Sequence, residues 1–168
     1  MQYITTYDSP IGTLILACEG ENLIGLWNED QKYFGSGLDV DTMTNKADIP
    51  VFQKAKKWLD EYFAGKNPQI SELPLAPAGS EFRKQVWDIL CEIPSGETVT
   101  YGDIAKQIAK KMGRKTMSSQ AVGGAVGHNP ISIIIPCHRV VGSNGNMTGY
   151  AGGIEKKIKL LDHEKKIK

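Results

Sequence analysis

The tripeptide Cys137-His138-Arg139 holds the side chains of this 168-residue chain best suited to chemistry. A cysteine thiolate is a strong nucleophile, an imidazole is a general base near neutral pH, and a guanidinium carries a permanent positive charge. Together they predict a nucleophilic Cys137 whose thiolate is favoured by His138 and Arg139. Cys18 and Cys91 have no such neighbours in the sequence. The competing explanation is a buried and inert cysteine, which is the common case for a single thiol.

The base His138 needs both a route to the sulfur and a partner of its own. Neighbours in an extended chain point to opposite faces, so His138 is expected to reach Cys137 around a tight bend or through a water molecule. Its second ring nitrogen needs an acceptor, and Glu164 in a C-terminal helix is the candidate. The buried face of that helix is predicted to comprise Ile154, Ile158 and Leu161. Glu164 lies at the edge of this face, although Lys157 falls in much the same arc.

The elements that position the tripeptide belong to the second half of the chain. Residues 131–135 form its most apolar run, and we expect a buried strand or extended segment that leads into Pro136 and Cys137.

Ser80 is expected to cap a helix with a stripe of Phe82, Val86, Ile89 and Leu90. Thr100 and Asp103 resemble a capping box at the start of a second helix. Ser118 or Ser119 is expected to cap a third, which ends before Asn129-Pro130.

The first half of the chain has a different sequence pattern. Short apolar or β-branched runs at residues 3–7, 13–17 and 23–27 alternate with turn residues, which predicts a strand meander. Residues 51–63 have helical spacing of Phe52, Ala55, Trp58, Leu59 and Phe63. A Pro-rich linker follows over residues 67–77.

The predicted succession of a helix, a basic turn and a short helix over residues 101–127 is the outline of a helix-turn-helix DNA-binding motif. The outline alone decides little, because most helical proteins contain two helices joined by a turn. Gly123 and Gly124 leave the third helix with little side-chain bulk, at a cost to helix stability. Either a neighbouring helix or the wall of a DNA groove therefore comes close to its backbone.

Charge and cysteine content narrow the class of protein. Residues 1–79 carry 6 Lys+Arg against 11 Asp+Glu, and residues 80–168 carry 14 against 8, so the second half is basic and is compatible with a polyanion. Solvated surface lysines would explain the same difference in charge between the two halves.

Three widely spaced cysteines suggest neither a disulfide framework nor a cysteine-rich zinc site, and no apolar run or leader-like start indicates a membrane or export. A cytoplasmic protein without a bound metal is predicted, and His163 is expected to be solvated.

Several motifs in a fixed order identify a resemblance to a known family. They are Ser9-Pro10-Ile11-Gly12, Ile93-Pro94-Ser95-Gly96, Tyr101-Gly102, Ala121-Val122-Gly123, Asn129-Pro130, Ile135-Pro136-Cys137-His138-Arg139-Val140-Val141, Gly149-Tyr150-Ala151-Gly152-Gly153 and Leu160-Leu161-Asp162-His163-Glu164. Over nearly its whole length the chain resembles the O6-alkylguanine-DNA alkyltransferases.

This resemblance implies an α+β fold of two domains. Residues 1–78 would form a small ribonuclease H-like domain with an antiparallel β-sheet and a helix, and residues 79–168 a mostly helical domain with the helix-turn-helix. The implied activity is direct-reversal DNA repair, in which a methyl or small alkyl group passes irreversibly from O6-alkylguanine, and in some cases O4-alkylthymine, to the protein. The implied partner is double-stranded DNA carrying the lesion, bound by a monomer that needs no cofactor.

The resemblance also assigns roles to individual residues. Cys137 would be the alkyl acceptor, His138 the base acting through water, Glu164 its orienting partner and Asn129 a hydrogen-bonding support. Residues implied to contact DNA or the flipped base are Tyr101, Gln120, Ala121, Gly123, Arg139, Val140, Tyr150 and Ala151. Within this set Tyr101 would press on the 3′ phosphate, and the Val140 carbonyl and Ala151 backbone would read the guanine edge.

The chain departs from the family pattern at Gln120, where many relatives carry arginine. Glutamine can enter the space left by a flipped nucleotide, but it lacks the fixed charge and the planar fork of arginine. Gly127 and His128 also differ from some relatives. The alternatives are a non-catalytic alkylated-DNA binding protein of the same fold, a cysteine hydrolase and a DNA-binding regulator. A retained Cys137 argues against the first, and the adjacency of cysteine and histidine against the second.

Overall fold

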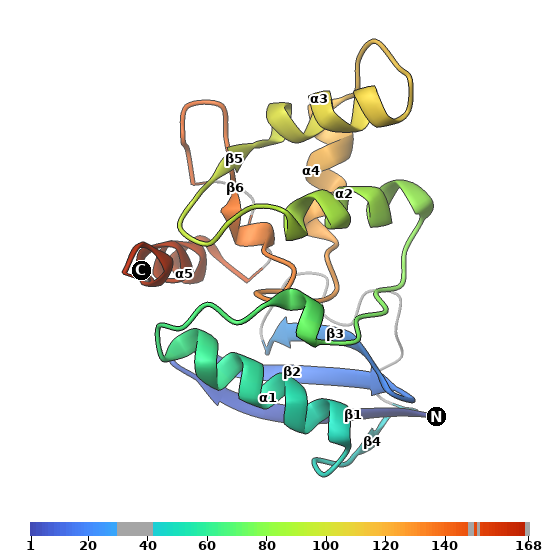
Figure 1. Ribbon diagram of the computed structural model, residues 1–168, viewed down its shortest axis with the longest axis vertical. Helices are drawn as coiled ribbons and strands as arrows, with labels where there is room; N and C mark the ends of the chain where they lie inside the picture. Colours follow the sequence, from blue (N-terminus) through green and yellow to red (C-terminus); the bar gives the residue numbers. More distant parts are fainter. Residues whose placement is uncertain (30–41, 148–149, 151, 167–168) are drawn as a thin grey trace.

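The computed structural model describes residues 1–29, 42–147, 150 and 152–166, and it shows a sheet with one helix below a mostly helical part (Figure 1). The three long strands are β1 (Gln2–Ser9), β2 (Gly12–Glu19) and β3 (Asn22–Asn28). They pair antiparallel as the predicted meander, with β2 between β3 and β1. The short β4 (Thr44–Asn45) is parallel to β1.

Helix α1 (Pro50–Phe63) lies along one face of this sheet (Figure 1). Proline at its first position suits a helix start, because the missing N–H is not needed there. Its buried residues are Val51, Phe52, Ala55, Trp58, Leu59 and Tyr62. The predicted stripe is thus confirmed except at its last member: Tyr62 continues the Ala55–Trp58–Leu59 face, and Phe63 is half-buried beside it.

The helical part begins after the 3₁₀ turn η2 (Ile70–Glu72). Its helices are α2 (Glu81–Cys91), α3 (Tyr101–Lys111), α4 (Ser119–Gly127) and α5 (Ile154–Lys165). The predicted caps are confirmed: the Ser80 side chain accepts from the Arg83 N–H, and Thr100 forms a capping box with Asp103. Of the two serines considered for α4, Ser118 is the cap. The short strands β5 (Val99–Thr100) and β6 (Val140–Val141) pair in parallel.

The free edge of β3 joins the sheet to the helical part. Near its start, the Leu23 N–H donates to Pro74 O at 2.8 Å and Leu23 O accepts from the Ala76 N–H at 2.9 Å. Further along, Leu26 makes the equivalent pair of bonds to residues 130 and 132, at 2.8 and 2.9 Å. Apolar side chains from both parts form one continuous buried cluster. The sheet therefore supports the segment that leads to Cys137.

Two expectations about the site segments are wrong. Residues 131–135 form a series of turns rather than a strand, with Ile133 at a φ of 71° and an Ile135 N–H that donates to Ile131 O. In α5, Ile154 and Ile158 are 48% and 40% exposed. The buried residues of this helix are Lys157, Leu160, Leu161 and Glu164. Within the described residues, no helix has the length and apolarity to span a membrane.

Candidate active site

Asn129 organises the turns that bring the chain to Cys137. Its Nδ2 donates to Ile135 O at 2.8 Å and to Ile131 O at 3.3 Å, and its Oδ1 accepts from the Ile131 N–H at 3.0 Å. Asn129 itself is buried, so these bonds replace the water that its amide and the turn carbonyls would otherwise bind. The side chain thus takes the place of the strand ladder that residues 131–135 lack.

Cys137 begins the 3₁₀ turn η3 (Cys137–Arg139) and is 5% exposed. Burial raises the pKa of its thiol, while hydrogen bonds from Asn129 and Ser132 and the charge of Lys157 act in the opposite direction. The resting form is therefore the thiol, and the prediction of a thiolate favoured by Arg139 is wrong. The cation that acts on the sulfur is Lys157.

His138 is fully buried and lies against Glu164, with His138 Nε2 2.5 Å from Glu164 Oε2. Bonds from His138 and Arg139 hold the pKa of Glu164 far below its ordinary value in spite of burial, so the carboxylate is ionised and can only accept. Nε2 must then carry the proton. Burial lowers the pKa of His138 against the opposing effect of the Glu164 carboxylate, which favours the neutral imidazole. Its Nδ1 is therefore an acceptor, and within the described part of the chain it has no hydrogen-bond partner.

The guanidinium of Arg139 donates hydrogen bonds to groups of the protein itself. Nε donates to Glu164 Oε1 at 2.8 Å, Nη2 to Glu164 Oε2 at 3.0 Å, and Nη1 to Ile93 O at 2.6 Å. The assignment of Arg139 to base binding is therefore not supported, because its guanidinium is buried in a two-pronged ion pair. Glu164 also accepts from the Tyr62 hydroxyl at 2.6 Å. We call Glu164, His138, Arg139 and Tyr62 the Glu164 cluster.

The sequence interpretation gave Lys157 no role in the site and missed Tyr62 altogether. Lys157 is 0% exposed, and its Nζ lies 2.5 Å from Val140 O. Burial lowers its pKa, and the charge of a Cys137 thiolate raises it. A signal for Lys157 was present, since it lies two helical turns before Glu164 and so shares its face. Tyr62 carried no such signal, because 102 residues separate it from Glu164.

Two tyrosines lie near the thiol. Burial raises the pKa values of Tyr101 and Tyr150, and the negative charge of a Cys137 thiolate would raise both further. Tyr101 is half-buried at the start of α3, and Tyr150 is buried. Ala151 and Gly149 lie outside the described residues. The Val140 carbonyl, expected to read guanine, accepts from Lys157 and retains a second lone pair.

Helix α4 presents the remaining residues expected to contact DNA. Gln120 and Ala121 are exposed, and Gly123 is half-buried. A Cβ at Gly123 would meet the Tyr101 ring at 3.9 Å, which is ordinary contact, and one at Gly124 would meet nothing within 4 Å. Packing within the protein therefore does not account for this pair of glycines.

His163 differs from its expected solvated state. It is half-buried, and its Nε2 lies 2.6 Å from the Tyr62 carbonyl oxygen. The C-terminal end of α1 packs against this part of α5, with the rings of Tyr62 and His163 5.1 Å apart. Among the described residues, no three His, Cys, Asp or Glu side chains gather as metal ligands would.

Comparison with known proteins identifies the family. Residues 2–77 match the ribonuclease-like domain of 6-O-methylguanine DNA methyltransferase, and residues 81–166 match its DNA binding domain. A methylated-DNA–protein-cysteine methyltransferase of Haemophilus influenzae is 40% identical over 97% of this chain and 86% of its own length. The chain belongs to the methylated-DNA–protein-cysteine methyltransferase family. A relative of the same name from Methanosarcina acetivorans is 42% identical over 96% of this chain and 97% of its own.

Solved structures of methyltransferases agree with this assignment. The crystal structure of Mycobacterium tuberculosis O6-methylguanine methyltransferase has a TM-score of 0.85 and 41% identity, over 100% of this chain and 95% of that one. A structure of the Mycobacterium tuberculosis protein in complex with DNA has a TM-score of 0.83 and 41% identity, over 97% and 92%. The predicted α+β class with a ribonuclease-like first part is confirmed. The boundary between residues 78 and 79 stays a prediction.

Proposed function

We propose that the chain is a direct-reversal DNA-repair enzyme in which Cys137 takes the alkyl group from O6-alkylguanine in double-stranded DNA. One observation carries this proposal in a chain of this family. The imidazole of His138 is buried and neutral, and its Nε2 donates to an ionised Glu164, which leaves Nδ1 to accept a proton. This is the arrangement of a general base held by an orienting carboxylate.

The reaction balances without a co-substrate. The Cys137 S–H proton passes through a water molecule to His138 Nδ1, and the sulfur attacks the alkyl carbon. An S–C bond forms, the C–O bond breaks, and its electron pair leaves with the guanine oxygen. The imidazolium then stands beside the Glu164 carboxylate, which stabilises it. Because the thiol, the base and the leaving group suffice, we propose that neither a metal nor a cofactor takes part.

The product predicts a single turnover. A thioether is a poor leaving group, and regeneration would need a second nucleophile at the alkyl carbon. The other two cysteines are placed elsewhere: Cys18 is buried in β2, and Cys91 is the last residue of α2. One molecule of protein should therefore repair one lesion.

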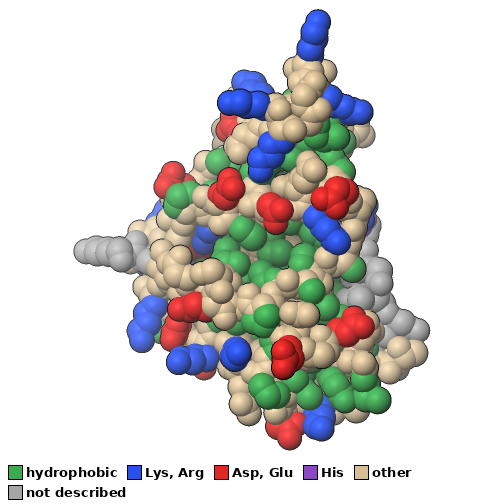
Figure 2. Space-filling model, turned by 45° about the vertical axis from the view of Figure 1, so that its right-hand side comes forward, with side chains coloured by type: hydrophobic (Ala, Val, Ile, Leu, Met, Phe, Trp, Pro, Cys, Tyr) green, Lys and Arg blue, Asp and Glu red, His purple; other side chains and the backbone are tan. Residues whose placement is uncertain are grey.

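The face that includes α3 and α4 is proposed to bind the duplex. Figure 2 shows Lys and Arg side chains gathered at the end of the molecule where α3 and the following loop lie. The exposed basic residues of this region are Lys106, Lys110, Lys111, Arg114 and Lys115. Phosphate neutralisation by such residues supplies affinity that is independent of base sequence. The open backbone at Gly124 supports a close approach of DNA to α4.

The lesion itself is proposed to enter beside Cys137 after extrusion from the duplex, since a buried sulfur cannot reach a stacked base. Tyr150 is proposed to line its pocket, and Tyr101 is proposed to press on the 3′ phosphate. The Val140 carbonyl and the Ala151 backbone are proposed to read the guanine edge. Gln120 and Ala121 are exposed on the DNA-facing helix, where Gln120 can occupy the vacated space.

The proposed state is a cytoplasmic monomer. The exposed large apolar side chains among the described residues lie at separate places, namely Met1, Met112 at the end of α3, and the pair Ile154 and Ile158 on α5. Such scattered groups do not make the apolar surface of an obligate dimer. Light scattering of the purified protein at micromolar concentration checks the mass.

Intact-protein mass spectrometry tests the activity. The protein is incubated with a duplex that contains one O6-methylguanine and with the same duplex unmodified. We expect a gain of one methyl group, placed at Cys137 by peptide mapping, only with the lesion, and no gain in Cys137→Ala. A molar ratio of lesion repaired to protein that exceeds one would contradict single turnover. Binding of the lesion duplex without any mass gain would favour a non-catalytic binding protein.

A further inference from the structure

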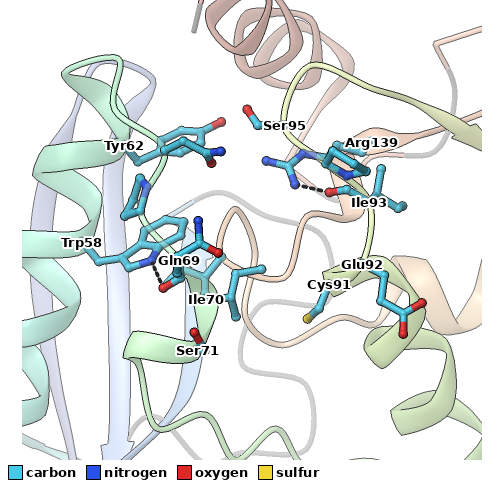
Figure 3. A pocket seen from close by; sticks show the side chains of 14 residues that line it. Trp58, Tyr62, Gln69, Ile70, Ser71, Cys91, Glu92, Ile93, Ser95 and Arg139 are labelled. Carbon is cyan, nitrogen blue, oxygen red and sulfur yellow. Dashed lines mark hydrogen bonds between the residues drawn. The ribbon is translucent and has the colours of Figure 1, made fainter. Parts of the chain in front are cut away.

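Tyr62 belongs to the ribonuclease-like part, yet its hydroxyl bonds to Glu164 in the helical part. Tyr62 and Glu164 are 2% and 1% exposed, and the hydroxyl oxygen lies 2.6 Å from Glu164 Oε2. Figure 3 shows Tyr62 on one side of a pocket and Arg139 on the other, with Ser95 between them. The pocket has a volume of about 610 Å³. The hydroxyl of Tyr62 thus joins the two parts of the chain beside a hollow in their interface.

The direction of this hydrogen bond follows from the charges. The pKa of Glu164 lies far below its ordinary value, so its carboxylate has no proton to give. Burial and the charge of Glu164 raise the pKa of Tyr62 well above its ordinary value, so the phenol keeps its proton. Tyr62 therefore donates and Glu164 Oε2 accepts.

Glu164 Oε2 is also the oxygen that receives the imidazole proton of His138. It accepts from His138 Nε2 at 2.5 Å, from Tyr62 at 2.6 Å and from Arg139 Nη2 at 3.0 Å. A donor on a carboxylate oxygen draws off part of its negative charge. The Tyr62 hydroxyl therefore weakens the attraction between Glu164 and a protonated His138, which lowers the basicity of the imidazole.

The tyrosine is held so that it can act in this way. A carbonyl oxygen can only accept, so His163 Nε2 donates to Tyr62 O at 2.6 Å. The Tyr62 ring stacks on Trp58, with centroids 5.7 Å apart and planes 7° from parallel. Two consecutive residues of α5, His163 and Glu164, thus bind the backbone and the hydroxyl of one residue of α1.

We propose that Tyr62 is a positioning residue for alkyl transfer, through which the ribonuclease-like part fixes Glu164 and sets the basicity of His138. The proposal rests on the proposed function, in which His138 is the base. It gives the first half of the chain a part in the reaction besides folding. Tyr62 does not touch the thiol or the lesion in this scheme, and it acts only through Glu164.

The test is the pH profile of single-turnover methyl transfer in Tyr62→Phe. Phenylalanine keeps the ring on Trp58 and removes only the donor. The neutral imidazole is the active form, so the rate falls as pH drops through the His138 pKa. Loss of the donor raises that pKa, and the midpoint of the acid limb should move up by about half a pH unit. Below the midpoint, this shift corresponds to a rate about threefold lower.

Tyr7→Phe is the matched control. Tyr7 donates to Asp60 Oδ1 at 2.5 Å, so this variant removes another phenol–carboxylate bond that also joins α1 to the rest of the protein. Its acid limb should keep the wild-type midpoint. A lower melting temperature of Tyr62→Phe with an unchanged midpoint means a structural role only and overturns the proposal.

Two further measurements distinguish an effect on the basicity of His138 from other causes of a changed rate. Difluorotyrosine incorporated at position 62 is a stronger donor of nearly the same shape, and it should move the midpoint down. Nitrogen-15 NMR of the labelled histidines follows the His138 titration without any lesion. If the wild type transfers no methyl group, the proposed function fails, whereas active protein with an unshifted His138 in Tyr62→Phe refutes the Tyr62 proposal alone.

Discussion

The Glu164 cluster and helix α4 differ in how far contacts within the protein account for their arrangement. Each carboxylate oxygen of Glu164 accepts from Arg139, and Oε2 also accepts from His138 and Tyr62, all in the protein interior. On α4, by contrast, Gln120, Ala121 and Gly124 are exposed, and a side chain at Gly124 would meet nothing. The cluster is organised by the protein alone. Contacts among the described residues do not account for the bare backbone of α4, which fits the DNA contact proposed for this helix.

Glu164→Gln should produce the largest change. The amide cannot stabilise a protonated His138, so we expect single-turnover methyl transfer to slow by about a hundredfold. It also leaves the buried Arg139 without its counter-charge, which should lower the free energy of unfolding by about 3 kcal/mol. Quenched-flow kinetics and urea unfolding measure the two effects.

Asp162→Asn is the control for that variant, because it removes a carboxylate from the same helix. Its contact with Lys165 is 4.0 Å long and exposed, and exposed pairs contribute little. Both the rate and the stability should match the wild type. A Glu164→Gln protein with wild-type kinetics would remove Glu164 from the mechanism.

The second prediction concerns stability against pH. Burial lowers the folded pKa of His138 below its ordinary value of 6.5, so the unfolded chain takes up a proton that the folded protein does not. This contribution to stability is present above the unfolded pKa and is lost as pH falls below about 6.5, by up to about 1.4 kcal/mol per unit. Replacement of His138 by Gln should flatten the dependence between pH 7 and 5.

Urea unfolding at pH 7.5, 6.5 and 5.5 measures this difference. His128→Gln, at the end of α4 and outside the cluster, is the control and should keep the wild-type slope. Equal slopes for the wild type and His138→Gln would mean that the imidazole is not held neutral in the folded protein.

Gly124→Ala sharpens the contrast at α4. Alanine is the better helix former by about 0.8–1 kcal/mol, and its methyl group finds open space, so the protein should become more stable. The same methyl group would stand between α4 and DNA. We expect affinity for an unmodified duplex to fall by about 1 kcal/mol, or roughly fivefold. Fluorescence anisotropy measures binding, and a more stable variant with unchanged affinity would place DNA elsewhere.

The same contrast explains what the sequence could predict. The meander, the helices and their caps follow from local patterns, because Ser80, Thr100 and Ser118 act within one helical turn. The link from His138 to Glu164 was within reach, since both lie in strong local motifs. Glu164 was expected at the edge of a buried face of α5, but the face that is actually buried is a different one. The Lys157–Glu164 face is polar at both ends, and an apolar pattern cannot reveal buried charges that are paired.

Other parts of the site depend on contacts that no local pattern encodes. Residues 131–135 look like a strand, but the side chain of Asn129 supplies bonds that allow turns instead. The ion pair that ties Arg139 to Glu164 spans 25 residues and engages the guanidinium inside the protein. Tyr62 contacts the cluster only because β3 and α1 dock on the helical part.

Gln120→Arg should have the smallest effect and tests how α4 acts. Position 120 is exposed near the start of this helix, where an arginine can reach into the space of an extruded nucleotide. We expect methyl transfer from a lesion duplex to be about threefold faster, because a planar five-donor group fills and bonds that space better than an amide. A slower or unchanged rate would mean that position 120 does not support base extrusion.

Gln107→Arg separates insertion from simple attraction. Gln107 is exposed on α3, so this variant adds the same charge to the neighbouring helix. Attraction of phosphates weakens steeply with salt, whereas a side chain seated inside the duplex is screened less. If insertion is responsible, the gain of Gln120→Arg persists from 50 to 200 mM salt and Gln107→Arg shows none at the higher concentration. Parallel loss in both variants would reduce position 120 to one more basic site on the DNA-facing surface.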